Sequence, residues 1–413
     1  MLIFGYDKFQ GKMPIVNGYA PDVKNNISPI NLDFAGYEFI PNIKDCEIRN
    51  IKDICKLRNT IHYENLKNYY RLTLEKVSDI HIKYYYVIDV YSHDFWKNDK
   101  AKDITISEKA LKDIKNNQAK ILVLFCTEPT RIKNPDTLEV LNSWIHKYNL
   151  PKRSIVISCG NHLAYDYFKY NEYISHVPVN RWELTMTDIP NQKEHSKILV
   201  NHIVNRGKRD KLFISYNRRP HYHRIRFVKI LYDSPLFKRG LISLGVPQDF
   251  EFISDIEDEF YNKLPLMIDN LNLEINRARD LTTKDYMRTY FSIITETTHD
   301  NKTVFMSEKI FKPIVSFHPF FVLTGMNFLK HLRRIGYKTF SEWFDESYDS
   351  EESLDKRISM IMSEIGRLSK FSENDLNKML IEMLPVLKHN YKTFVKRIKS
   401  KKYEEKLKEI LWK

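Results

Sequence analysis

The feature that most constrains this chain is a series of short, dense apolar runs separated by helix-length segments. The first runs are Tyr84–Val90 and residues 120–125, and another follows at 154–158. Apolar runs of this length are typical of strands that are buried on both faces of a sheet. The segments between them, near 107–117 and 136–148, carry apolar residues at helical spacing. Strands that alternate with helices in this way predict βαβ units and a parallel sheet.

A second series of the same kind begins after a polar segment at 191–210, which we expect to lead out of the first unit. Four more strands are predicted, at 211–215, 240–245, 290–294 and 319–323. A helix is expected over 224–232 and a long amphipathic helix over about 259–279. The fold class is therefore α/β, with two Rossmann-like domains at 1–205 and 206–348 and a helical C-terminal extension at 349–413. Within the first domain, residues 1–80 look loop-like and then polar and helical.

The net charge of the 413-residue chain is +13, and much of it lies at the C-terminal end. Residues 388–413 hold ten Lys or Arg and three Glu. Such an end fits a solvated basic helix, or a surface for nucleic acid, anionic glycan or membrane. Apolar residues at helical spacing over 371–396 predict that this stretch packs, whereas the basic end beyond Lys396 should be exposed.

Several features predict a soluble protein of the cytoplasm. The longest apolar run, at 121–126, is far shorter than the ~18 residues of a membrane span. The four cysteines are Cys46, Cys55, Cys126 and Cys159, too sparse for a disulfide framework, and buried free thiols are expected. No glycine-rich phosphate loop, H-E-x-x-H motif or D-x-D pair occurs. We therefore expect neither a bound cofactor nor a metal ion.

Two constellations carry the chemistry that remains. The first follows the strand at 211–215 and crowds hydrogen-bond donors into eight residues: Asn217, Arg218, Arg219, His221, His223 and Arg224. Ligands of open parallel sheets bind at the carboxyl ends of strands, and arginine suits phosphate oxygens. This loop therefore predicts a phosphate or diphosphate site. The alternative is a basic surface loop at a helix start.

The second constellation is the segment from Ser307 to Leu323. Ser307 is a natural helix N-cap, with Glu308 in the first turn and Lys309 and Lys312 after it. Pro313 should kink or end this helix. A carboxylate suits sugar or ribose hydroxyls and an ammonium group suits a phosphate. The alternative is an ordinary capped helix that packs on a strand.

Together these segments resemble a known enzyme family. Ser-Glu-Lys-Ile-Phe-Lys-Pro-Ile at 307–314, followed by His-Pro-Phe-Phe-Val-Leu at 318–323, resembles the donor-site segment of α-1,3-fucosyltransferase-like enzymes of the GT-B fold. Asn-Arg-Arg at 217–219 resembles the family's arginine-bearing loop. Residues 329–348 resemble glycosyltransferase-like proteins of phages and other viruses. The resemblance covers roughly 205–350 and departs at 313–318, where the family usually has small residues.

The resemblance implies a metal-independent glycosyltransferase of the GT-B type, whose two domains face a cleft. The donor would be a nucleotide-diphosphate sugar, and its binding residues would be Asn217, Arg218, Arg219, Ser307, Glu308, Lys309 and Lys312. The acceptor would be a hydroxyl group of a glycan, or of a modified base in DNA. A viral enzyme of this kind would act in the host cytoplasm. The alternative is a non-catalytic nucleic-acid-binding protein that uses the basic loops and the basic end.

An inverting transfer also needs a general base near the acceptor hydroxyl, and we expect it in the first domain. Glu128 leads the candidates because it follows the apolar run at 121–125, and Pro129 restricts the turn after it. His162 and Asp94 hold similar positions after their own strands. The alternative for each is a loop residue that caps a neighbouring helix.

Overall fold

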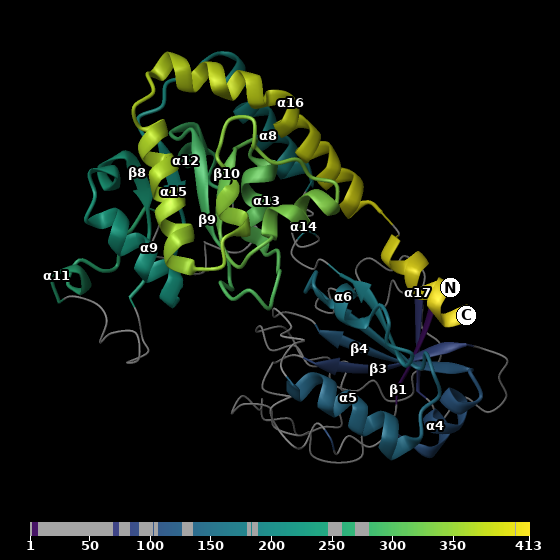
Figure 1. Cartoon of the computed structure of the whole chain (residues 1–413). Coiled ribbons are helices and arrows are strands. Elements are labelled where there is room, and N and C mark those ends of the chain that lie inside the picture. The colour runs from purple at the N-terminus through teal and green to yellow at the C-terminus, as the bar shows by residue number, and fades with distance from the viewer. Residues whose placement is uncertain are drawn as a thin grey trace, which may run out of the picture. The chain divides into compact units, whose positions relative to one another are not determined.

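The computed structural model describes residues 2–6, 69–73, 83–90, 102, 106–125, 135–179, 183, 189–246, 258–268, 281–400 and 402–413. The chain forms two compact units (Figure 1). Unit 1 consists of Met1–Leu184 together with Ser400–Lys413, and unit 2 consists of Thr185–Lys399. Each unit is a parallel sheet with packed helices, which confirms the α/β class with two Rossmann-like domains. The division lies at 184 rather than 205, and the region 349–413 is shared between the two units.

Unit 1 is built on a parallel sheet with the order β2-β1-β3-β4-β5-β6. Its strands are β1 (Leu2–Tyr6), β2 (Tyr69–Thr73), β3 (Tyr84–Val90), β4 (Ala119–Phe125), β5 (Ile155–Cys159) and β6 (Ile174–Pro178). The strands predicted at 84–90, 120–125 and 154–158 are confirmed. Strands β1, β2 and β6 were not predicted, and the other residues of 1–80, on which the loop-like and helical expectation rests, lie outside the described residues. Strands β2 and β6 lie at the sheet edges and mix polar with apolar residues, so they lack the dense apolar signal.

Helices α4 (Glu108–Lys115) and α5 (Pro135–Tyr148) cover one face of this sheet. Tyr84 and Tyr86 of β3 point to that face, where Trp144 of α5 is fully buried. Helix α6 (Ala164–Phe168) follows β5 and packs on β6. Cys159 is buried with a free thiol, as predicted, whereas the other three cysteines lie outside the described residues.

The last helix, α17 (Lys402–Trp412), belongs to unit 1 and packs beside β1 and β6 (Figure 1). The Tyr85 hydroxyl donates to the carbonyl of Leu407 at 2.7 Å, and the hydroxyls of Ser158 and Tyr403 are 2.9 Å apart. Leu407 and Leu411 are buried. The expectation that the whole chain beyond Lys396 is exposed is therefore wrong, because these leucines give the basic end an apolar side.

Unit 2 is built on a smaller parallel sheet with the order β10-β9-β7-β8. Its strands are β7 (Phe213–Ser215), β8 (Gly240–Ile242), β9 (Phe291–Thr295) and β10 (Phe320–Leu323), all within the predicted ranges or one residue beyond. The first strand, β7, is flanked by β8 on one side and β9 on the other. The strand order therefore reverses between β7 and β9, as it does at the switch point of other doubly wound sheets.

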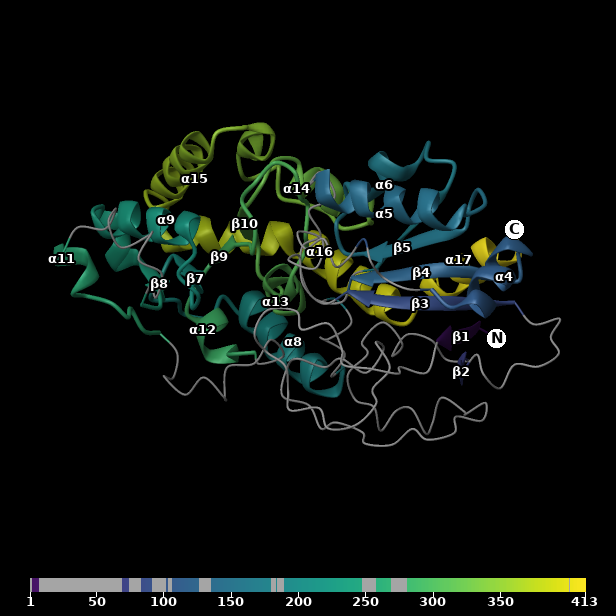
Figure 2. The ribbon, with the colours of Figure 1, turned by 90° about the horizontal axis from the view of Figure 1, so that it is seen from below.

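Helices cover both faces of the unit 2 sheet (Figure 2). On one side lie α9 (Tyr222–Tyr232) and α15 (Leu354–Leu368), and on the other lie α8 (Ile189–Val204), α12 (Thr283–Met287) and α13 (Glu308–Val315). The remaining helices are η4 (Pro235–Arg239), α11 (Asp258–Tyr261), α14 (Phe328–Arg334), η5 (Ser347–Ser350) and α16 (Glu373–Ile398). None of the helices that the structure describes is long and apolar enough to cross a membrane.

Two expected segments differ in unit 2. The polar segment at 191–210 is largely the helix α8, whose Leu199 and Ile203 are buried. The long helix expected over about 259–279 is confirmed only at its start, because α11 ends at Tyr261 and residues 262–268 are not helical; residues 269–279 lie outside the described residues. Pro265 has no N–H for a helix interior, and Leu266 instead exchanges two 2.9 Å backbone hydrogen bonds with Leu244.

Candidate functional site

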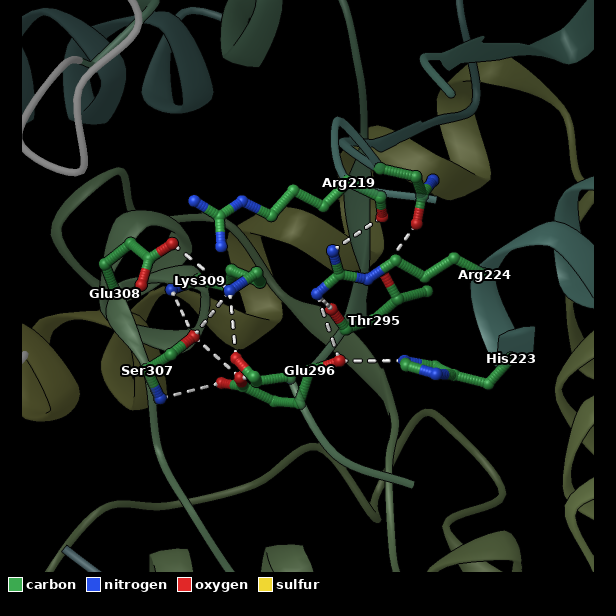
Figure 3. Close-up of polar contacts among 10 residues, drawn as sticks. Arg219, His223, Arg224, Thr295, Glu296, Ser307, Glu308 and Lys309 are labelled. Carbon is green, nitrogen blue, oxygen red and sulfur yellow. Dashed lines mark hydrogen bonds and ion pairs between the residues drawn. The ribbon is translucent and has the colours of Figure 1, made fainter. Parts of the chain in front are cut away.

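The loops after β7 and β9 bring the two predicted constellations together at the carboxyl edge of the unit 2 sheet (Figure 3). The connection after β7 leads into α9, and the connection after β9 leads into α13. These helices lie on opposite faces of the sheet, so the loops diverge at the switch point (Figure 2). Ligands of open parallel sheets bind outside the strands at such a point.

Asn217 fixes the first of these loops from inside. It is fully buried, and its side-chain amide donates to the Ser215 hydroxyl at 2.9 Å. The side-chain oxygen of Asn217 accepts a hydrogen bond from the Thr295 hydroxyl. The backbone N–H of Asn217 donates to the Ser243 hydroxyl at 3.1 Å. Asn217 therefore ties the ends of β7, β8 and β9 together. Its side chain acts within the protein, which makes it a positioning residue for the neighbouring arginines.

Arg224 connects the loops after β7 and β9. Its guanidinium donates to the Arg219 carbonyl at 3.0 Å, to the Thr295 carbonyl at 3.0 Å and to the Glu296 carbonyl at 3.1 Å (Figure 3). Burial lowers its pKa to about 10, against the opposing effect of Glu296 and Glu308, so it stays charged at neutral pH. The ring of His223 is fully buried beside it and donates to the same Glu296 carbonyl at 2.8 Å. Three of the six predicted donors, Asn217, His223 and Arg224, thus support the loop itself.

The other donors of this loop lie nearer the surface. Arg219 is exposed, and Arg218 and His221 are partly buried. In Figure 3 the side chain of Arg219 extends toward the side where Glu308 and Lys309 lie. The fixed backbone and the accessible guanidinium groups suit the recognition of an anion.

Glu296, which the sequence analysis did not single out, organises the second loop. Its carboxylate is fully buried and accepts the Ser307 N–H at 3.0 Å and the Ser307 hydroxyl at 2.6 Å. Burial raises its pKa, although Lys309 and Ser307 oppose that shift. The available signal was its position: Glu296 is the first residue after the buried strand β9, where a side chain stands at the carboxyl edge of the sheet.

Ser307 is the N-cap of α13, as predicted, and its hydroxyl accepts the Lys309 N–H. The Lys309 ammonium donates to the Ser307 hydroxyl at 3.0 Å, the Thr297 hydroxyl at 3.4 Å and the Glu308 carboxylate at 3.2 Å. Helix α13 contains Pro313 and ends two residues after it, in agreement with the expectation that the proline ends the helix. The lysine is held at the helix start beside the arginine loop (Figure 3).

Glu308 is mostly buried, and its carboxylate faces Lys309 and Lys312. Burial acts to raise its pKa, but the two lysines outweigh burial and lower the pKa below its usual range. Glu308 is therefore a carboxylate at neutral pH. Around it the edge carries a positive excess: three arginines and two lysines meet two carboxylates, namely Arg218, Arg219, Arg224, Lys309, Lys312, Glu296 and Glu308.

No group of three or more His, Cys, Asp or Glu that could hold a metal ion occurs among the described residues. His162, the one general-base candidate that they include, lies in the turn between β5 and α6 of unit 1 and is partly buried. Glu128 and Asp94 lie outside the described residues.

The segment at 344–349, part of the viral resemblance, supports the fold. The Glu346 carboxylate accepts the Phe340 N–H at 2.6 Å and the Thr339 hydroxyl at 2.8 Å. The Asp349 carboxylate accepts the Leu329 N–H at 2.8 Å at the start of α14. The Tyr348 hydroxyl accepts the Val322 N–H of β10 at 3.2 Å. These residues hold β10 and α14 in place.

Comparison with solved structures finds a weak likeness. No protein-family model matches the chain, and no curated protein matches its sequence. Among solved structures, the chain is similar to the catalytic domain of starch synthase IV from Arabidopsis thaliana, bound to ADP and acarbose. The identity is 10% and the TM-score is 0.33, over 76% of this chain and 73% of that chain. A likeness at this level does not bear on function.

Proposed function

We propose that this protein is a glycosyltransferase that binds a nucleotide-diphosphate sugar at the carboxyl edge of the unit 2 sheet. The observation that carries the proposal is the positive excess at the switch point between β7 and β9. Arg219 and Lys309 reach this edge from different loops, and buried Asn217, Arg224 and Glu296 fix the two loops. A diphosphate carries the charge and the oxygen acceptors that such an edge lacks.

The chemistry of sugar transfer explains why cations are needed there. The acceptor oxygen bonds to the anomeric carbon of the sugar, and the bond from that carbon to the diphosphate breaks. The departing nucleoside diphosphate then carries one more negative charge, which Arg219 and Lys309 stabilise. With this arrangement we propose that no divalent cation is required. Glu308, ionised at the same edge, suits hydroxyl groups of the ribose or the sugar, as the fucosyltransferase-like resemblance implies.

The general base is proposed to come from unit 1, with Glu128 first, then His162 and Asp94. A Glu128→Gln variant keeps the side-chain shape and removes the basicity. Turnover should fall ~100-fold or more while donor affinity stays unchanged. Near-normal turnover would move the assignment to His162 and then Asp94.

A second candidate function is nucleic-acid binding without catalysis, and helix α16 favours it. Its C-terminal half exposes Lys388, Lys392, Lys396 and Lys399 at a spacing of three or four residues, which places them along one side of the helix. No Asp or Glu occurs from 383 to 403. The same stripe suits an anionic acceptor for the transferase, such as DNA. Binding of a DNA duplex that weakens steeply with salt and is lost in a Lys388→Gln, Lys392→Gln, Lys396→Gln variant would support a role in nucleic-acid binding.

The proposed function is tested by a thermal-shift screen with GDP, UDP, ADP and CMP sugars, because a ligand of the native state raises its melting temperature. The nucleotide sugar that stabilises most is then incubated with EDTA, and release of the nucleoside diphosphate is measured. Stabilisation by one nucleotide-diphosphate sugar and turnover in EDTA are expected. No stabilisation by any of them refutes the donor site, and turnover that requires Mn²⁺ or Mg²⁺ refutes the metal-independent mechanism.

A further inference from the structure

His221 lies in the arginine loop, beside the cations of the edge. It is the N-cap of α9, yet its side chain does not cap the helix. The capping contacts are made by its backbone carbonyl, which accepts the N–H groups of Arg224 and Ile225 at 2.9 and 3.0 Å. Its ring stacks parallel to the ring of His223, with 6.2 Å between the centroids.

Charged groups from three elements face this ring. Arg219 comes from its own loop, Arg224 from α9 and Lys309 from α13. Burial, followed by these three cations, lowers the pKa of His221 to about 4. The imidazole is therefore neutral in the free protein at physiological pH, although it is only partly buried.

Two further histidines and two carboxylates lie near this ring. The ring of His223 is fully buried, and its pKa lies well below the usual range because burial disfavours the charged form. The ring of His299, from the loop after β9, is 4.8 Å from that of His223 and also acts on His221. The carboxylates of Glu296 and Glu308 face Arg224 and Lys309. His221 is thus the partly accessible histidine at which the arginine and lysine charges converge.

We propose that His221 is a proton-linked contact for the diphosphate: its imidazole takes up a proton from solvent when a diphosphate binds beside Arg219 and Lys309. This inference rests on the proposed function, because it requires an anion at the same edge. Burial and the neighbouring cations together keep the ring neutral, and a bound diphosphate offsets the effect of the cations, so the protonated ring is favoured in the complex. A protonated imidazole then donates an N–H to a phosphate oxygen, and the charge-assisted bond strengthens as the leaving group gains charge.

Linkage fixes the sign of the expected pH dependence. A group whose pKa is higher in the complex than in the free protein makes binding tighter as the pH falls between the two values. The affinity for the diphosphate should therefore fall as the pH rises from about 4 to the pKa of the bound imidazole, by at most about tenfold per pH unit, and level off above that pKa. An uncharged replacement removes this dependence.

The test uses the GDP, UDP or ADP hexose that stabilises the protein most, because its diphosphate diester does not titrate near neutral pH. Calorimetric titration at pH about 6.5 in two buffers of different ionisation enthalpy counts the protons taken up, and roughly half to one proton per binding event is expected. The His221→Gln variant should bind more weakly and take up almost none. His389→Gln is the matched control, because the His389 ring, on α16, contacts the Gly336 carbonyl and the variant should leave proton uptake as in the parent.

The other possible results of these titrations each overturn the inference, and they can be distinguished from one another. Binding without proton uptake in the parent refutes the role of His221 and leaves the donor site intact. Uptake that persists in His221→Gln but disappears in His299→Gln assigns the proton to the second ring. Failure of all three sugars to bind refutes both the inference and the proposed function. A pH series on the parent protein is independent of any variant's folding, and a Kd that is constant from about pH 5.5 to 8 also refutes the inference.

Discussion

Arg219 and Arg224 lie five residues apart, yet the guanidinium group of Arg224 is buried and that of Arg219 is exposed. Arg224 is 3% exposed and its donors are directed at three backbone carbonyls. Arg219 is exposed and extends toward α13 (Figure 3). The buried arginine fixes the loop whose backbone presents the accessible arginine. One arginine therefore supports the loop, and the other remains accessible to solvent.

Glu296 gives a prediction at the residue scale. A Glu296→Gln change replaces one acceptor by an amide donor that faces the Ser307 N–H or hydroxyl. One hydrogen bond is lost and a buried donor is left unpaired, which should cost about 1–3 kcal/mol of unfolding free energy. Because Ser307 in turn contacts Lys309, donor affinity should fall about tenfold or more. Denaturant unfolding and calorimetric titration measure the two effects.

Glu346→Gln is the matched control for this change. Glu346 is also a mostly buried carboxylate that accepts a backbone N–H and a hydroxyl, but it lies in the segment that supports β10. It should lower stability to a similar extent and leave donor affinity unchanged. Equal affinity losses in both variants would show that Glu296 acts through general stability.

The residue types of the site could be predicted from the sequence. Which of these residues are buried in support of the loops, and which are accessible, could not. Arg219 and Lys309 follow predicted strands or caps, and the structure brings them to one edge (Figure 3). Burial decides the rest: Arg224 and His223 look like further donors until the structure places them against the Glu296 carbonyl. Glu296 itself is a single acid after a strand, and its partner Ser307 is eleven residues away.

At the scale of elements, the loop after β8 lies against the loop after β7. The Gly245 N–H donates to the Asn217 carbonyl at 3.3 Å. A Cβ atom at Gly245 would stand 2.1 Å from the Arg218 carbonyl oxygen, which is backbone and cannot turn aside. The absence of a side chain at Gly245 therefore permits the observed path of the arginine loop.

Gly245→Ala should displace the arginine loop. Overpacking of this kind typically costs about 1–3 kcal/mol, and donor affinity should fall because Arg218 and Arg219 move with their backbone. Thermal unfolding and donor titration measure the two effects. Gly366→Ala is the control: no atom lies within 4 Å of a Cβ there, and an alanine inside α15 should raise stability by up to about 1 kcal/mol. Unchanged donor affinity in Gly245→Ala would contradict a loop path set by this contact.

Dense apolar strands and capped helices were predictable at this scale, because their signals are local. Strand β9 and the cap at Ser307 are examples. Helix α8 was not recognised because its polar composition conceals the few apolar residues that pack. Its attachment to unit 2 depends on distant partners, such as the Val315 carbonyl that accepts the Ser196 hydroxyl at 2.6 Å.

At the scale of the whole molecule, the chain leaves unit 2 at Lys399 and completes unit 1 with α17. A Leu407→Ala change should destabilise unit 1 by about 2–5 kcal/mol, because Leu407 is fully buried. It should leave donor binding by unit 2 unchanged, since α17 is part of unit 1. Chemical unfolding and donor titration separate the two outcomes.

Trp412→Ala serves as the control for α17, because Trp412 is 63% exposed and its loss should change stability by no more than about 0.5 kcal/mol. A Leu407→Ala variant as stable as this control would show that α17 does not complete unit 1. The return of α17 could not be predicted from its basic composition, because its partners Tyr85 and Ser158, which contact the Leu407 carbonyl and the Tyr403 hydroxyl, are distant in the sequence.

The central claim is that the loops after β7 and β9 form the nucleotide-sugar site, and one titration tests it most directly. The nucleotide sugar selected by thermal shift is titrated, with EDTA present, into the parent, Arg219→Ala and Lys309→Ala. Lys238→Ala and Arg239→Ala are matched controls, because both side chains are exposed just before β8, at the opposite end of the strands. The account predicts that each site variant loses about 2 kcal/mol or more, roughly 30-fold in Kd, while the controls bind as the parent does. Folded site variants that bind as tightly as the controls would contradict it.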